Sequence, residues 1–250
     1  MTNSINKIPE IQLRAFRAIN EPRTCEQFVK GHTDVLASIG VTKVTSSKNE
    51  WTEDPAVFVI VVESLDSQEV YGGARVHVSS GKNLLPIESA TKDMDPYVLQ
   101  LVADHARKGT GEVCGLWNSP YLAGYGIGSP LLIRAGVAIS TQIGIESLFA
   151  LCAPYTVKAV VNCGMVLEES IGNKGTFYYP KLDLVATAMV LKNVADLHLA
   201  LDEDKEAIQH MRNDPNDFQL FELKQKEIMI DFKLSIPGLD QWQLPTPGNS

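Results

Sequence analysis

The glycine-rich segment at residues 121–129 has the residue types to bind an anion. It reads Y-L-A-G-Y-G-I-G-S and runs directly into an apolar helical pattern, LLIRAGVAI. Glycines between a strand and a helix let backbone N–H groups converge on one anion, and the helix N-terminus adds a partial positive charge. The segment therefore predicts a phosphate or pyrophosphate cradle, unless its glycines serve only a tight turn and close helix packing.

Spacing excludes two common phosphate-binding loops. A Walker A loop ends in Gly-Lys-Ser/Thr, whereas Gly128 is followed by Ser129 and Pro130. A G-x-G-x-x-G dinucleotide loop starting at Gly124 would need a third glycine at the position of Ser129, and it would lie near the start of the chain. The remaining possibility is a short G-x-G loop that holds a pyrophosphate at the start of a helix.

The elements around this loop predict a mixed α/β sheet. Period-two alternation or continuous β-branched runs predict strands at residues 11–19, 57–63, 70–80, 111–120, 145–154, 182–191 and 227–236. Helical spacing of apolar residues predicts helices at residues 25–40, 97–108, 131–144, 156–165 and 202–212. The second and third strands form a hairpin, and the loop lies inside a central strand–loop–helix–strand unit.

Composition limits the partners of this chain. Thirty acidic and 22 basic side chains give a formal net charge of −8. An acidic chain lacks the basic surface expected of a nucleic-acid-binding protein. Four cysteines without a CxxC pair and five dispersed histidines predict no metal site and no disulfide framework. No apolar run reaches the ~18 residues of a membrane span, and no secretory signal is visible, so we expect a cytoplasmic protein.

The loop with its helix, GIGSPLLIRAGVAI, followed by IESLFALCAP and TVKAVVNCGM, resembles the core of the GNAT N-acyltransferase superfamily. The resemblance covers about residues 11–191 and rests on pattern and order. It implies an α/β (α+β) fold: a mixed, mostly antiparallel central sheet flanked by helices, with splayed parallel strands at the acyl-CoA site. Residues 1–195 would form this domain, and residues 196–250 a helix–strand extension packed on it, with a loose proline-rich end.

The resemblance implies acetyl-CoA or another acyl-CoA as co-substrate. The family's Gln/Arg-x-x-Gly-x-Gly/Ala loop falls on Ala123, Gly126 and Gly128, or in a second phasing on Tyr121, Gly124 and Gly126. Neither phasing supplies the Gln or Arg, although backbone N–H groups make most phosphate contacts. Valine at Gly126 or Gly128 should fill the cradle and forbid its backbone angles. The expected cofactor-binding residues are Leu116, Trp117, Asn118, Ala123, Gly124, Tyr125, Gly126, Ile127, Gly128 and Ser129, the first three as the strand end that pairs with the pantetheine arm.

Acyl transfer to an amine needs a base for the amine proton and an acid for the leaving thiolate. Glu112 is the candidate base, with a solvated strand-end carboxylate as the alternative. The family's acid position is Val160 here, so Tyr155 is the candidate acid, with a rim tyrosine as the alternative. Arg75 and His77 alternate on one strand face, which either contacts the substrate or is a solvated sheet face.

Three further features are similar to acyl-homoserine-lactone and N-acyl amino acid synthases: the GARV strand, the insertion with Leu85-Pro86, and the strand glutamate. Gly115 stands where the lactone synthases have arginine, and their aromatic N-terminal signature is not apparent. Such enzymes often use acyl carrier protein, but no basic patch for this acidic partner is visible.

Three functions stay open. The chain transfers an acyl group from acyl-CoA to the primary amine of a small molecule, or it is an acyl-carrier-protein-dependent N-acyl amino acid or autoinducer-type synthase. The third is a non-catalytic GNAT-like domain that binds acyl-CoA, which the departures at Ala123 and Val160 support.

Overall fold

The computed structural model describes residues 9–38, 40, 49–123, 127–180, 183–223 and 226–245. Its strands are β1 (Glu10–Arg17), β2 (Val57–Glu63), β3 (Val70–Val78), β4 (Thr110–Asn118), β5 (Ser147–Cys152), β6 (Val166–Leu167), β7 (Thr176–Tyr178), β8 (Val185–Leu191), β9 (Phe218–Leu223) and β10 (Lys226–Lys233). Its α-helices are α1 (Pro22–Ser38), α2 (Pro86–Thr91), α3 (Tyr97–Ala106), α4 (Pro120–Ala123), α5 (Ser129–Ile143), α6 (Pro154–Asn162) and α7 (Asp202–Asn213). A 3-10 turn, η3 (Glu50–Glu53), precedes β2.

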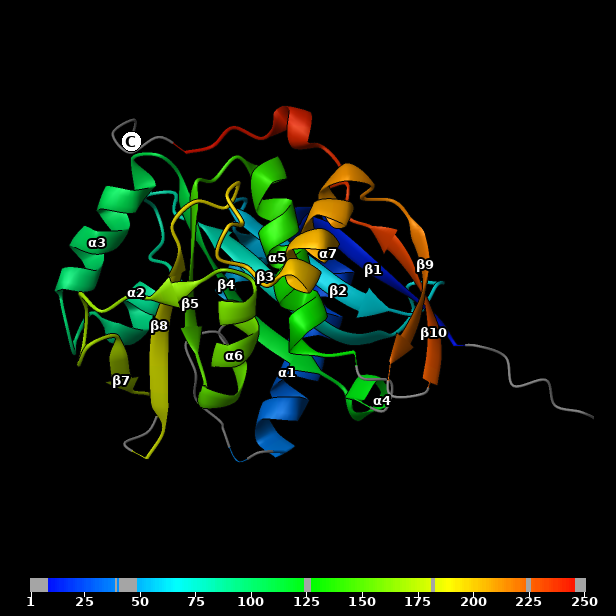
Figure 1. Cartoon of the computed structure of the whole chain (residues 1–250), viewed down its shortest axis with the longest axis horizontal. Helices are drawn as coiled ribbons and strands as arrows, with labels where there is room; N and C mark the ends of the chain where they lie inside the picture. The colour runs from blue at the N-terminus through cyan, green and yellow to red at the C-terminus, as the bar shows by residue number, and fades with distance from the viewer. Residues whose placement is uncertain are drawn as a thin grey trace, which may run out of the picture.

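The ten strands that the structure describes belong to one sheet, in the order β6-β8-β5-β4-β3-β2-β1-β10-β9, with β7 also paired to β8 (Figure 1). Among the strands that the structure describes, β4 with β5 and β1 with β10 are parallel, and the other pairs are antiparallel. This confirms the mixed, mostly antiparallel sheet flanked by helices that the sequence predicts.

Strand β2 shows how the sequence divides the sheet into two faces. Its side chains alternate between the faces, and every one is buried because helices cover both. Phe58, Ile60 and Val62 join the core under α5, whereas Val57, Val59 and Val61 join the core near α1. Full burial of each such side chain contributes about 1.5–3 kcal/mol, so this strand has no alternative register with similar stability.

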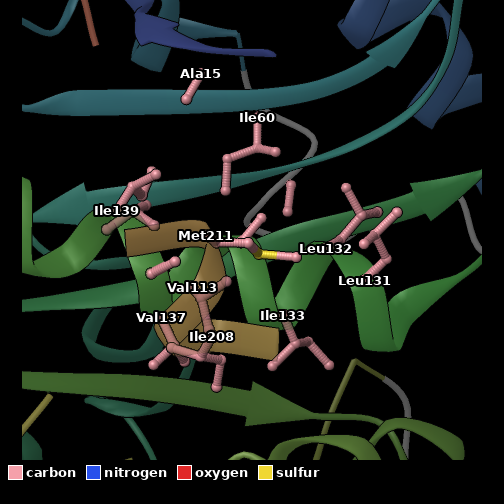
Figure 2. Packing of buried hydrophobic residues seen from close by; sticks show 14 of the residues in the cluster. Ala15, Ile60, Val113, Leu131, Leu132, Ile133, Val137, Ile139, Ile208 and Met211 are labelled. Atoms are coloured by element: carbon pink, nitrogen blue, oxygen red, sulfur yellow. The ribbon is translucent and has the colours of Figure 1, made fainter. Parts of the chain in front are cut away.

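Helices α5, α6 and α7 cover the first face (Figure 1). Figure 2 shows this core, where apolar side chains of α5 lie between the sheet and Ile208 and Met211 of α7. An ion pair from Arg134 Nε to the buried Asp204 Oδ1, at 2.7 Å, fixes α7 on α5. Helix α1 covers one part of the opposite face, and α2 and α3 cover another over a separate apolar cluster.

The C-terminal segment extends the central sheet. Strand β10 pairs in parallel with β1, and β9 pairs with β10 at the edge. After β10 the chain returns to the core, where Trp242 Nε1 donates to Ile143 O at 2.9 Å and the indole packs edge-on against Phe58.

Five α-helices or strands of the structure have no counterpart in the prediction: α2, α4, β6, β7 and β9. The first four are two to six residues long, too short for a periodic apolar pattern to emerge. Strand β9 exposes Phe218 and Leu220 at the sheet edge, so its pattern does not separate an apolar from a polar face. Within the described ranges, no helix is long and apolar enough to cross a membrane.

Candidate active site

The parallel strands β4 and β5 separate partway along their length. They pair only over residues 110–112 and 147–149, although β4 continues to Asn118 and β5 to Cys152. In the part of the chain that the structure describes, no other strand pairs with the freed edge of β4. Cys114, Gly115 and Leu116 are half-buried there. The freed backbone edge can accept an extended ligand by strand-like pairing.

The glycine-rich loop ends at the N-terminus of α5. Gly128 is the N-cap residue, Ser129 opens the helix, and the Ile127 side chain is buried. No side chain caps this end, and the first turn holds no acidic residue, so its N–H groups suit an anion. Gly124, Tyr125 and Gly126 lie outside the described residues, as do the side chains of Tyr121 and Ala123.

The backbone of Gly128 differs from the expectation. Its φ of −160° is extended, which any residue can adopt. Among the described residues, a Cβ added there would meet only Pro130 Cδ, at 3.9 Å. The prediction that a side chain would be forbidden by the backbone angles is therefore wrong at this position.

A bulge in β4 makes room for a buried cation. The pairing register with β3 shifts between Gly73 and Arg75, and Gly115 has φ +61°. A Cβ on Gly115 would lie 2.7 Å from Arg75 Nη2, so only glycine fits at this bulge. Arg75 is fully buried, with its guanidinium carbon 4.3 Å from the Trp51 ring centroid, a distance typical of a cation–π contact. Its strand face is therefore not solvated.

Glu112 lies on the same face of the sheet as Arg75, at the last position of β4 that pairs with β5. It is 1% exposed, and its Oε2 accepts a hydrogen bond from Ile87 N at 2.6 Å. Burial, with a smaller contribution from the neighbouring Glu88, raises the pKa of Glu112 to about 8, while the Ile87 N–H bond and Arg75 oppose the rise. A carboxyl with this pKa can exchange a proton near neutral pH. The alternative of a solvated strand-end carboxylate does not describe its position.

His77 is the cross-strand neighbour of Glu112. Burial, with Arg75 adding repulsion, lowers the pKa of His77 well below its usual value, so the imidazole is neutral. Its Nε2 atom is buried, and among the described residues it has no hydrogen-bond partner. His77 is thus a neutral polar group next to the candidate base.

The other predicted residues lie farther from Glu112. Leu116 packs against the core under α5, and Trp117 and Asn118 pair with Gly73 and Gly72 of β3. Tyr155, at the start of α6, is 78% exposed, and α6 lies on the sheet face opposite to Glu112. The structure thus groups Arg75, His77 and Glu112 but not Tyr155. No described group of three or more His, Cys, Asp or Glu residues could hold a metal ion.

The site also contains residues that the sequence analysis missed. Trp51 and Phe28 contact the Arg75 guanidinium, and Ile87 and Glu88 lie beside Glu112. They come from η3, α1 and α2, which are distant in sequence from β4. Ile87 contributes its backbone N–H to the site, and the type of a residue does not predict where its backbone N–H will bind.

Gly31 of α1 allows Trp117 to pack under this helix. A Cβ at Gly31 would lie 2.0 Å from Trp117 Cη2. Gly31→Ala, which would stabilise an ordinary helix by roughly 0.5–1 kcal/mol, should here lower the free energy of unfolding by about 1–3 kcal/mol through overpacking. Urea denaturation measures the change, and Gly31→Ala with Trp117→Leu should recover part of it. A stabilised Gly31→Ala chain would contradict this packing.

Two solved structures are similar to this chain. FeeM, an N-acyl amino acid synthase from uncultured soil microbes, is 19% identical over 77% of this chain and 97% of its own, with a TM-score of 0.56. BjaI, a CoA-dependent acyl-homoserine lactone synthase solved with SAM and isopentyl-CoA, is 13% identical over 81% of this chain and 90% of its own, with a TM-score of 0.50. No family model and no curated protein matches the chain. The likeness confirms the GNAT fold.

Proposed function

We propose that this chain, with its GNAT fold, is an N-acyltransferase that moves an acyl group from acyl-CoA to the primary amine of a small molecule. The observation that carries the proposal is Glu112, a buried carboxyl with a raised pKa at the point where β4 and β5 separate. Such a group accepts the proton that an amine must lose as it attacks a thioester.

The donor site is assigned to the gap and the start of α5. The freed β4 edge offers backbone groups to the pantetheine arm, and the uncapped α5 N-terminus offers N–H groups to the pyrophosphate. Of the residues that the structure describes, only Pro130 comes within 4 Å of a Cβ placed on Gly128, which is compatible with a pyrophosphate there. The similar BjaI structure, described as CoA-dependent, supports CoA over acyl carrier protein as the donor.

Within this class, an amino acid is the acceptor that the site favours. The pKa of an α-amino group is about 7.7–8.0, close to the value of about 8 for Glu112, so proton transfer between them costs little. Arg75 places a positive charge on the same face, to which an acceptor carboxylate would be attracted. The similarity to an N-acyl amino acid synthase supports this second, narrower function.

A binding titration tests the donor. CoA, acetyl-CoA and a long-chain acyl-CoA are each added to the full chain in a calorimeter, and we expect saturable binding of at least one. Thiol release is then followed with amino acids and with simple alkylamines as acceptors. No binding of any of the three would exclude an acyl-CoA donor. Binding without release for every amine would indicate a non-catalytic acyl-CoA-binding domain.

A further inference from the structure

Two buried carboxyl groups, Glu88 of α2 and Glu112 of β4, accept hydrogen bonds from backbone N–H groups at the start of α2. Glu88 reaches back along its own helix, where its Oε2 accepts a hydrogen bond from Leu85 N at 2.7 Å, as the glutamate of a capping box does. In the same turn, the backbone N–H of the buried Ile87 donates to Glu112 Oε2. The same turn therefore carries Glu88 and orients Glu112.

Apolar packing fixes this turn in place. Leu85 and Ile87 are buried in one cluster with Val98 and Val102 of α3 and Phe149 of β5. Phe149 is also the residue that pairs with Glu112 across the parallel ladder. The position of α2 relative to β4 is therefore fixed by this packing. The bond from Leu85 N–H to Glu88 fixes the shape of the first turn and with it the direction of the Ile87 N–H.

We propose that Glu88 is the positioning residue for Glu112: it fixes the α2 turn that holds the base, and it adds a negative charge beside it. The inference rests on the proposed function, because Glu112 is the base of that reaction. Glu88 contacts neither donor nor acceptor in this scheme and acts through Glu112.

The charged and titratable groups around Glu112 come from four elements. Strand β3 supplies Arg75 and His77, β4 itself supplies Cys114, and α2 supplies Glu88. Strand β5 supplies Cys152, whereas its residue paired with Glu112, Phe149, is uncharged. Of these groups, Glu88 is the one whose charge raises the pKa of Glu112 and which can be neutralised without touching the sheet.

Glu88 is less completely buried than Glu112, with 6% against 1% of the residue exposed. It lines a cavity of about 190 Å³ together with Lys82 and the α3 residues Val102 and Ala103. Burial raises the pKa of Glu88 too, and the Leu85 N–H opposes this rise. Because Glu112 is completely enclosed, the burial penalty falls more heavily on it, so Glu88 ionises first and its charge opposes ionisation of Glu112.

The test measures the titration of Glu112 directly. Glutamate side-chain carboxyls of the full chain are labelled with ¹³C, and Glu112→Gln identifies the Glu112 signal. Glu88→Gln keeps an oxygen to accept from Leu85 N–H but removes the charge, so the Glu112 midpoint should fall by on the order of one pH unit. Thr91→Val is the matched control, because it breaks a buried bond to Ile87 O in the same helix without changing charge.

Two results would overturn the inference: an unchanged midpoint in Glu88→Gln, or an equal shift in Thr91→Val. In the activity assay, Glu88→Ala should lower kcat by on the order of tenfold or more, with an unchanged KM for the acyl donor, because the base is misplaced. The proposed function fails separately, if Glu112→Gln keeps full turnover. The titration needs no substrate, so these failures are distinguishable.

Discussion

Glu112→Gln is expected to lower turnover by ~10²-fold or more while the affinity for acyl-CoA stays unchanged. The amide keeps the shape of the side chain and an oxygen that accepts from Ile87 N–H, but it cannot take a proton from the amine. Thiol release gives kcat, and calorimetry gives the affinity. Glu227→Gln, an exposed position on β10, is the matched control and should behave as the parent chain. Unchanged turnover in Glu112→Gln would remove this residue from the mechanism.

The same substitution should remove the pH dependence that Glu112 gives to the stability of the fold. The pKa of Glu112 is raised from an ordinary 4.5 to about 8, so the folded chain binds this proton more tightly than the unfolded chain. The resulting stabilisation is complete below pH 4.5 and is lost as the pH rises to about 8. At about 1.4 kcal/mol per pKa unit, the loss is on the order of a few kcal/mol, and Glu112→Gln should lack it.

Activity should follow the opposite pH trend. Turnover needs the ionised carboxylate, so the rate should rise with pH until about 8, where Glu112 has titrated. Urea unfolding midpoints and kcat, each measured between pH 5 and about pH 9, give both curves. If the rate is already constant from the lowest pH measured, as expected for a carboxyl with the ordinary pKa of 4.5, Glu112 is not the group that limits it.

The sequence predicts those parts of the fold that leave a long periodic signal. Strand β2, with buried side chains on both faces, has the predicted bounds, residues 57–63. Helix α5 begins two residues before the predicted start, because Ser129 and Pro130 form its first turn. Pairings between distant segments leave no such signal: the parallel register of β1 with β10 depends on a strand more than two hundred residues away.

The candidate site is predictable only where a side chain bears the chemistry. The alternating pattern of β3 places Arg75 and His77 on one face of that strand, and Glu112 lies at the start of β4. These positions could be identified from the sequence. The surroundings that change their chemistry could not: η3 brings Trp51 over Arg75, and α2 brings a backbone N–H to Glu112. A raised pKa is a property of enclosure, and enclosure depends on elements that the local sequence does not reveal.

Gly128→Val is expected to weaken CoA binding on the order of a hundredfold or more and to leave the fold intact. The extended backbone accepts a β-branched residue, and within the described residues the added Cβ meets only Pro130 Cδ, at 3.9 Å. The cost to folding is therefore that of a poorer helix cap, about 1 kcal/mol. The branched side chain instead fills the space before the α5 N-terminus, where charge-assisted N–H bonds of about 1.5–3 kcal/mol each would be lost.

Calorimetry with CoA and urea denaturation of the same samples separate the two effects. Gly128→Ala provides a graded comparison, because a single methyl group should weaken binding less than valine does. Glu112→Gln provides the converse case, in which binding persists and turnover is lost. If Gly128→Val binds CoA as the parent chain does, the pyrophosphate lies elsewhere, and Gly128 serves only as the cap of α5. If binding and stability fall together, the loss of binding reflects a damaged fold, and the cradle assignment loses its support.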